Sequence, residues 1–427
     1  MLPSPETTKE VDVFMMRSMF AGVSGLKNHQ TRMDVVGNNI SNVNTVGFKG
    51  SRATFAEMMN QTIQGAQSPQ DNRGGVNPQQ IGLGVDLASI DTDQTQGSLE
   101  STGIETDLAV DGDGFFRVND GQQDLYTRAG NFTVDEGGNL VSSSNGYKVQ
   151  GWTADDDGEI NTNDTVGDLE IPIGDSISGQ ATKTARFTGN LDSEADDGTT
   201  RTTTVEVYDS LGASHTVELE LEKEGDNDWG VNLISINGED PDNYDYEWDI
   251  NDNLDFDSDG NFLSGDNTFE FDPGEGAESD QEVELDFSRM SQSAGEFSID
   301  GSAEDGYEYG FLDSFGIDNR GIINGNYTNG INQQIGQVGL ANFSNPSGLV
   351  KEGETIFRES QNSGEAQFGE ATVGGRGEIA PGTLEMSNVD LAEQFTNMIV
   401  TQRGFQANSR SITTSDEMLQ ELTNLKR

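Results

Sequence analysis

The side chains that most often carry catalysis or bind transition metals are scarce in this sequence. It contains two histidines, His29 and His215, which are far apart in the chain, and no cysteine. This composition excludes a disulfide, a Cys/His nucleophile and a thiolate zinc site. We expect both histidines to be solvated or structural, His29 on the polar face of a helix and His215 at the start of a hairpin strand. The sequence therefore predicts no catalytic residue and no cofactor.

Carboxylates are so abundant that their presence alone identifies no site. There are 76 Asp and Glu residues against 23 Lys and Arg, which gives a net charge of −53. Any two of these acids could be paired as in a glycosidase, so such pairs have no diagnostic weight. The glycine-rich stretches 111–114 and 374–377 lack the strand-to-helix context and the lysine of a phosphate-binding loop, so they are interpreted as turns.

One acidic motif resembles a metal-binding loop. Asp255, Asp257 and Asp259, followed by Gly260, match the first half of a calcium loop. The twelfth position is occupied by Asp266 rather than the usual Glu, and no flanking helices are predicted. A weak calcium site and a plain hairpin turn both remain open, and the pattern favours the turn.

The acid excess limits the classes of partner. Binding to nucleic acid or to anionic lipid would be electrostatically unfavourable, so we expect neither nucleic-acid binding nor membrane insertion. A similar excess is typical of proteins from high-salt organisms. The sequence has no apolar run near the 18 or so residues of a membrane span and no basic-then-apolar signal peptide, so export would need another route.

The two ends of the chain carry matching apolar patterns at helical spacing. Residues 16–41 and 387–426 each show the 4-3 rhythm of a coiled coil and are close to neutral, so the negative charge is concentrated between them. This partition predicts a polymerising subunit whose ends pack while its middle faces water, although an antiparallel helix pair closing one domain has the same pattern. The predicted self-assembly residues are Met19, Val23, Leu26, Met33, Ile40, Leu391, Phe395, Met398, Phe405, Ile412 and Leu419.

Between the helical ends the sequence favours many short strands joined by tight turns. A hairpin is expected from 204–208 and 216–221, where apolar and acidic residues alternate, with one face in a core and the other made of carboxylates. The predicted fold is multidomain and mainly β, with paired terminal helices of coiled-coil type. The expected parts are an extension (1–15), an N-terminal helix beginning near Met16 with its connecting region (16–60), a linker (61–80), a split β domain (81–155 and 301–380), an inserted acidic β domain (156–300) and a C-terminal helix (381–427).

Both terminal signatures resemble the bacterial flagellar rod and hook family. At the N-terminal end they are MRSMFAGVSGL at 16–26, VGNNISNVN at 36–44 and GFK at 47–49. At the C-terminal end they are LEMSNVDL at 384–391 and MIVTQRGFQAN at 398–408. The stretch GQVGLANFSNPSGL at 336–349 also resembles this family, and VYDSLG at 207–212 is the one familiar stretch in the middle.

The resemblance implies a structural subunit without enzymatic activity that builds an extracellular, curved, hollow tube of the flagellum between the motor's rod and the filament. In the family the paired terminal helices line the channel, the split β domain forms the wall and the inserted domain faces outward. Implied partners are the chain itself, the flagellar rod, a hook cap, hook–filament junction proteins and the type III export apparatus. The connecting region between helices and wall would contain Asn38, Asn39, Gly47, Phe48 and Lys49.

The chain departs from the family pattern at its start, because the family's first residue corresponds to Met15 or Met16. Some members crosslink their subunits through cysteine, which this sequence lacks. The rival interpretations are a distal rod protein, a hook–filament junction protein and, from another class, a secreted acidic calcium-binding adhesin. The adhesin would account for the β content and the Asp255 loop, but it would not account for the paired terminal heptads.

Overall fold

The computed structural model describes residues 5–69, 73–155, 158–174, 176–241, 247–250, 253–265, 267–274 and 276–425. The chain divides into two compact units. Unit 1 comprises residues 1–171, 317–323 and 335–427, and unit 2 comprises 172–316 and 324–334. The fold is mainly β with a long helix at each end, which confirms the predicted fold class. Unit 2 overlaps the expected insertion but begins at Pro172, whereas the expected first residue, 156, lies outside the described residues.

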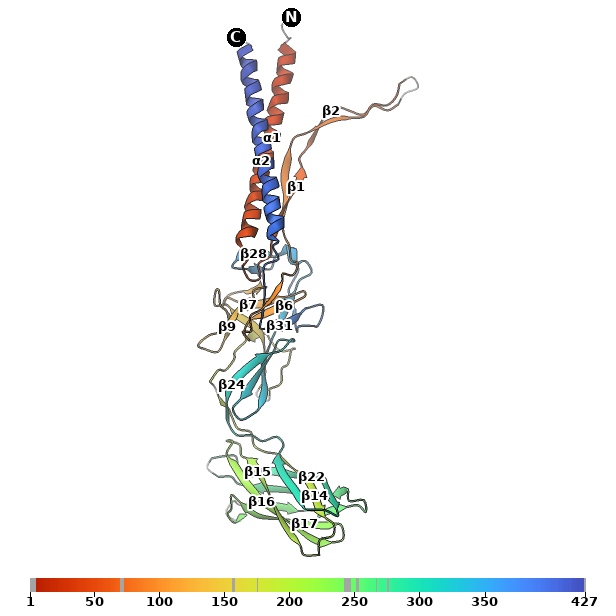
Figure 1. Cartoon of the computed structure of the whole chain (residues 1–427), viewed down its shortest axis with the longest axis vertical. Helices are drawn as coiled ribbons and strands as arrows, with labels where there is room; N and C mark the ends of the chain where they lie inside the picture. The colour runs from red at the N-terminus through yellow and green to blue at the C-terminus, as the bar shows by residue number, and fades with distance from the viewer. Residues whose placement is uncertain are drawn as a thin grey trace. The chain divides into compact units, whose positions relative to one another are not determined.

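Unit 1 contains the two long helices, which run antiparallel and side by side (Figure 1). Helix α1 spans Pro5–Ser41 and α2 spans Leu391–Leu425. The predicted start of the first helix near Met16 is therefore wrong, because the helix already begins at Pro5. Proline is well tolerated in the first turn of a helix, where its missing N–H has no helical partner.

The β part of unit 1 is built from short strands with many turns. Strands β7, β8, β29 and β28 pair in that order, β11 pairs with the other edge of β7, and β6 and β5 pair with β31 and β32. Aromatic side chains fill its core, where Phe115 contacts Phe343 and Phe357 edge to face. The elements are β1 Ser51–Glu57, β2 Asn60–Gln64, β3 Gln79–Gly82, β4 Val85–Thr92, β5 Leu99–Ser101, β6 Leu108–Asp111, β7 Phe115–Asn119, β8 Asp124–Thr127, β9 Phe132–Val134, β10 Leu140–Ser142, β11 Lys148–Thr153, β12 Gly167–Asp168, β27 Leu340–Asn342, the 3-10 helix η2 Pro346–Gly348, β28 Val350–Gly353, β29 Ile356–Arg358, β30 Gln367–Gly369, β31 Glu378–Pro381 and β32 Thr383–Glu385.

The stretch expected to be a linker, 61–80, contains paired strands instead. Strand β2 pairs antiparallel with β3, and β1 pairs antiparallel with β4, so residues 51–64 and 79–92 form two successive two-stranded ladders. Its richness in Gln and Asn hid the alternation of apolar residues that marks a strand pair. The prediction of a linker or extended loop is therefore wrong at the two ends of this stretch, 61–64 and 79–80, which are strand.

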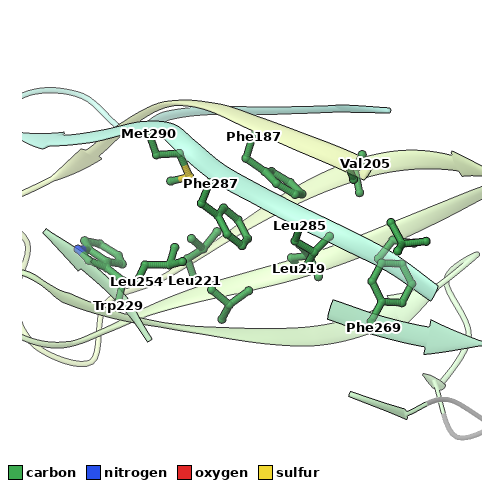
Figure 2. Close-up of a cluster of buried hydrophobic side chains, with 14 of the residues drawn as sticks. Phe187, Val205, Leu219, Leu221, Trp229, Leu254, Phe269, Leu285, Phe287 and Met290 are labelled. Atoms are coloured by element: carbon green, nitrogen blue, oxygen red, sulfur yellow. The ribbon is translucent and has the colours of Figure 1, made fainter. Parts of the chain in front are cut away.

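Unit 2 is a sandwich of two five-stranded sheets that share one core. One sheet has the order β18-β21-β22-β14-β23 and the other β15-β16-β17-β19-β20. Figure 2 shows the core between them, with Trp229 at one end and Phe269 at the other. The strands are β13 Ser176–Ile177, β14 Thr184–Asp192, β15 Thr200–Tyr208, β16 Ser214–Gly225, β17 Asp228–Ile236, β18 Glu247–Ile250, β19 Leu254–Phe256, β20 Phe262–Ser264, β21 Asn267–Phe271, β22 Gln281–Ser293 and β23 Ser298–Ala303; β24 Gly310–Ile317, β25 Ile322–Tyr327 and β26 Asn332–Val338 contain residues of both units.

The predicted acidic hairpin is confirmed by strands β15 and β16. Val205 lies opposite Val217 in their antiparallel register. Val217, Leu219 and Leu221 are buried, and the intervening acids of β16 are not. One face of this sheet is therefore core and the other carries carboxylates, as alternation with a period of two requires.

Candidate assembly surface and its polar joint

The two helices meet along a stripe of small and polar residues. A Cβ atom built on Gly22 would lie 3.0 Å from Ile412 Cγ1, and one built on Gly404 would lie 2.6 Å from the His29 ring. Gly25 faces Asn408 even more closely. Because these glycines lack side chains, the two backbones approach closely, and larger residues of the partner helix fill the space. The pair is held in register by this fit.

Polar contacts fix the same register at other levels of the helix pair. The hydroxyls of Ser18 and Ser415 are 3.2 Å apart. Farther along, Arg32 Nη2 donates to Asn397 Oδ1 at 3.0 Å. His29 lies in this seam, so the prediction that it belongs to the polar outer face is wrong. Its buried Nδ1 has no hydrogen-bond partner among the described residues, and burial, assisted by Arg32, lowers the pKa of its imidazole.

The seam does not coincide with the apolar stripe that the sequence pattern selects. The residues of α1 that face α2 precede the predicted positions by about one residue. None of the eleven predicted assembly residues is fully buried in the single chain. The exposed members are Val23, Leu391, Phe395 and Phe405, and the half-buried members are Met19, Leu26, Met33, Ile40, Met398, Ile412 and Leu419.

The outward faces of the helix pair consequently carry large exposed apolar side chains. Phe20 is 60% exposed and Phe395 is 50% exposed. Isolated exposed apolar residues are ordinary on protein surfaces, but rows of them along a helix indicate a surface that contacts another molecule. The apolar residues exposed on the two helices are Met16, Phe20, Val23, Leu391, Phe395, Ile399, Val400, Phe405 and Met418.

The connecting region joins the helix pair to the β part of unit 1 through buried polar groups. Asn39 is buried, and its side chain both donates to Ser51 O (2.8 Å) and accepts from Ser51 N (2.9 Å). The Gly47 N–H donates to Glu385 O at 2.8 Å, and Lys351 Nζ lies 5.1 Å from the centre of the Phe48 ring. Asn38 is exposed on the last turn of α1, where its side-chain oxygen accepts from Asn42. Of the five predicted connecting residues, Asn39, Gly47 and Phe48 make these contacts at the joint, and Lys49 pairs with Glu385 in the same region.

A buried ion cluster lies at the centre of the joint. Glu385 is fully buried and accepts from Lys49 Nζ at 2.7 Å and from Arg128 Nη1 at 3.4 Å. Burial lowers the pKa of Lys49, and the adjacent Glu385 carboxylate opposes that shift. Two backbone carbonyls add to the cluster, since Lys49 Nζ also donates to Thr95 O and Arg128 Nη2 donates to Gly112 O, whereas the buried Arg128 Nε has no partner among the described residues. Paired in this way, the charges stabilise one arrangement of the chain at the joint.

Sequence reasoning missed two functional members of this joint. Arg128 lies far from both terminal signatures, and nothing in its neighbourhood distinguishes it from a surface arginine. Asn388 lies inside the C-terminal signature, where its side chain accepts from Gly50 N (2.8 Å) and donates to Asp93 O (2.9 Å). Asn388 and Glu385 belong to the same sequence signature, at 384–391, and this shared position could have pointed to Asn388 as a member of the joint.

The stretch that contains the weak metal candidates Asp255, Asp257 and Asp259 forms a hairpin turn between β19 and β20. Asp257 Oδ1 accepts from the backbone N–H groups of Asp259 and Asn261 at 2.8 Å each, and the hydrogen bond from the Asn261 side chain is the largest cause of its lowered pKa. Asp255 is bonded to Ser264, and Asp266 lies outside the described residues. In the part of the chain that the structure describes, no group of three or more acidic or histidine side chains could hold a metal ion.

His215 is structural rather than solvated. It is buried beside the aromatic ring of Phe271, its Nε2 lies 3.2 Å from Asp209 Oδ2, and Asn237 Nδ2 lies 3.0 Å from its Nδ1. Asp209 in turn accepts from Leu211 N and Ala213 N, which fixes the turn between β15 and β16. Among the described residues, no helix is long and apolar enough to cross a membrane.

Four family models match along the chain, and two of these matches overlap at residues 175–180. Residues 19–49 match the flagella basal body rod protein model, and residues 380–425 match the C-terminal model of the flagellar basal body rod FlgEFG protein. Residues 109–180 match the D1 domain of flagellar hook protein FlgE/F/G, and residues 175–307 match the flagellar basal body protein FlaE D2 domain. The last match falls within unit 2.

Similar proteins match over nearly the whole chain. Flagellar hook protein FlgE of Borreliella burgdorferi is 45% identical over 96% of this chain and 100% of its own length. The hook protein FlgE of Treponema pallidum is 41% identical over 97% and 100%, and the flagellar basal-body rod protein FlgG of Bacillus subtilis is 34% identical over 97% and 100%. The crystal structure of Helicobacter pylori flagellar hook protein FlgE2 shares the fold, with a TM-score of 0.51 at 16% identity over 67% of this chain and 100% of that one.

These matches, together with the paired terminal helices and the exposed apolar helix faces, define a structural protein of the flagellar axis. The chain belongs to the flagellar rod and hook protein family. Within that family it is a structural subunit of the flagellar hook, which is an extracellular part of the flagellum.

Proposed function

We propose that copies of this chain polymerise through the outward faces of their helix pairs into a curved, hollow tube that acts as a universal joint between rod and filament. In this arrangement the helix pairs line the channel, the β part of unit 1 forms the wall, and the acidic sandwich faces water. Unit 2 holds 38 acidic against 5 basic residues, so packing its copies tightly together would be electrostatically unfavourable.

One observation carries the proposal, namely that α1 and α2 use their small residues for each other and leave their large apolar residues uncovered. Burying apolar surface contributes about 25 cal/mol per Å², so the exposed Phe and Ile side chains favour association with further helices. The function then needs no active site. A homopolymer formed by head-to-tail contacts also has two different ends, which can meet different proteins.

We infer from family membership the partners at those ends and on the export route. They are the flagellar rod, the hook cap, the hook–filament junction proteins and the type III export apparatus. The connecting region, with Asn39, Gly47, Phe48 and Lys49, transmits load from the helix pair to the wall. The buried Lys49–Glu385–Arg128 cluster suits that role because it resists rearrangement.

Substitution of one exposed apolar residue tests the proposal. Phe405→Asp places a charge on the outward face of α2 and should abolish polymerisation, because burying an unpaired carboxylate costs several kcal/mol. Phe405→Leu is the matched control and should still form tubes. Electron microscopy and sedimentation at the same protein concentration distinguish the two, and normal tubes from the aspartate variant would contradict the proposal.

A further inference from the structure

An open pocket in unit 2 has no role in the proposed assembly. It has a volume of about 430 Å³ and lies beside Trp229, which Figure 2 shows at one end of the sandwich core. Sites for small molecules commonly measure roughly 300–1,000 Å³, so the pocket has a suitable size. Aromatic, acidic and basic side chains contribute to its lining, which includes Asp192, Thr199, Arg201, Trp229, Glu296 and Phe297.

Two aromatic residues line the inner part of the pocket. Trp229 is fully buried, and Phe297 is half-buried and packs against the same core. The indole Nε1 of Trp229 has no hydrogen-bond partner among the described residues. Because buried tryptophan N–H groups usually have a partner, a ligand oxygen in this pocket would supply the acceptor that the protein lacks.

Arg201 provides further hydrogen-bond donors at the exposed side of the pocket. Its guanidinium lies over the Phe297 ring, 5.7 Å from the ring centre. Unit 2 holds 38 acidic against 5 basic residues, yet Arg201 forms no ion pair with any described residue. An arginine held over an aromatic ring in so acidic a domain keeps its N–H groups available for a ligand.

The carboxylates of Asp192 and Glu296 line the same pocket as hydrogen-bond acceptors. A matching ligand therefore has to accept from Arg201 and donate to carboxylates. It is also uncharged, because the acid excess of unit 2 would repel an anion. Hydroxyl groups both donate and accept, and the C–H face of a sugar ring suits an aromatic surface.

The rim of the pocket is held in place without a ligand. Lys223 is buried, and its Nζ donates to Ser193 O at 2.8 Å and to Ala195 O at 2.7 Å. The Gly198 N–H donates to Lys223 O at 2.7 Å, so both ends of the 192–199 turn are fixed to β16. A site that is already ordered loses less conformational entropy when a ligand binds.

We propose that this pocket binds a neutral saccharide, either a free sugar or a sugar unit of a cell-surface glycan. The hook is an extracellular part of the flagellum, so the pocket can meet both. Arg201 and the Trp229 N–H donate to sugar oxygens, and Asp192 and Glu296 accept from sugar hydroxyls. The binding requires no contact between copies and is therefore a property of the monomer.

Indole resonances of the full-length monomer report on the pocket directly, because the chain has only 3 tryptophans. The protein is labelled with nitrogen-15 in its indoles, and Trp229→Phe identifies the Trp229 signal. The probes are the methyl glycosides of glucose, galactose, mannose and N-acetylglucosamine, and the matching disaccharides. We expect a saturable shift of the Trp229 signal, with the signal of Trp152, in unit 1, unchanged. Tighter binding of a disaccharide than of its single sugars would assign the source to a glycan, and equal binding to a free sugar.

Two arginine substitutions test the assigned contacts. Arg201→Ala should weaken sugar binding at least about tenfold, since hydrogen bonds from a charged group are lost. Arg289→Ala removes an exposed arginine of the same domain outside the pocket and should leave the affinity unchanged.

Three results would overturn the proposal. One is that no neutral saccharide shifts the Trp229 signal. Another is that Arg201→Ala binds sugar as tightly as Arg289→Ala. The third is that methyl glucuronide, an anion, or N-acetylalanine methylamide, a neutral peptide, binds as tightly as the best neutral sugar. Each of these results concerns the monomer and leaves the proposed function standing.

Discussion

The helix pair and the β-sandwich bury opposite kinds of residue. In the sandwich the large apolar side chains are inside, with Phe187 stacked on Phe287 at 4.8 Å and both fully buried. In the helix pair glycine, serine and asparagine are inside, and Phe20, Phe395 and Phe405 are outside. The sandwich therefore has a core of its own, whereas the helix pair leaves large apolar side chains exposed, which other copies would cover in the proposed assembly.

Because of this difference, the stability of the two regions should depend on assembly to different degrees. A domain with a filled core is stable whether or not it is assembled. A helix pair that buries only a narrow seam, and that contains Gly22, Gly25 and Gly37, each costing about 1 kcal/mol relative to alanine, gains most of its stability from neighbours. Assembly is thereby coupled to the ordering of the part that makes the contacts.

We expect the largest difference between the two regions in the stability lost when a core residue is truncated. Phe187→Ala should destabilise the sandwich by about 3–5 kcal/mol, because it removes a fully buried ring and leaves a cavity. Ile412→Ala, which trims a half-buried residue over Gly22, should cost far less in the monomer. Calorimetry of both variants checks this, and equal losses would remove the contrast between the two regions.

The second effect concerns the buried Lys49–Glu385–Arg128 cluster in the joint beside the helices, which we expect to contribute to the stability of unit 1. Glu385→Gln leaves Lys49 and Arg128 buried without their anion and should destabilise unit 1 by about 3–5 kcal/mol. Burial already lowers the pKa of Lys49, so the folded state takes up its proton less readily than the unfolded chain does. The stability of the variant should therefore recover in part as the pH rises toward the ordinary lysine value of about 10.4.

Denaturant titrations between neutral and alkaline pH measure this recovery. Glu393→Gln, at an exposed position in the first turn of α2, is the matched control and should change the free energy of unfolding little. A loss for Glu385→Gln as small as that of the control would show that the cluster does not hold the joint.

The smallest expected effect comes from His29 in the seam. Burial, with Arg32 nearby, lowers the pKa of this imidazole, so its contribution is present above the unfolded value of about 6.5 and is lost as the pH falls through the folded value. Assembly should therefore weaken on mild acidification. His29→Gln should remove that part of the pH dependence, which sedimentation across pH 5–8 measures, and an unchanged pH profile would exclude His29 as its source.

The structural predictions from the sequence were more accurate for some parts of the chain than for others, because the parts carry different physical signals. Alternation in 204–221 gave the acidic hairpin correctly because one face is buried within the same chain. The heptad stripe correctly indicated helices at both ends, but it does not mark the seam between them. Apolar periodicity identifies the surface that must be covered, and here Gly22, Gly25 and Gly404 let the helices pair through their smallest residues instead.

The polar joint was predictable only in part. Asn39, Gly47 and Lys49 belong to a signature that could be recognised, whereas Arg128 reaches Glu385 only through the folding of the β part. The pairing of β2 with β3 was missed because amide-rich sequence resembles a linker, and it joins segments 60–64 and 79–82, which are separated in the sequence. Contacts that are distant in sequence leave little trace in composition or periodicity.

Hydrogen exchange in monomer and polymer tests the central claim most directly, with the sandwich as an internal reference. We expect amides of α1 and α2 to exchange rapidly in the monomer and to become strongly protected in the tube, while those of β15, β16 and β22 are protected in both states. The account requires that protection appear with assembly, because neighbouring copies cover the outward apolar faces. Helix amides as protected in the monomer as those of the sandwich would contradict it.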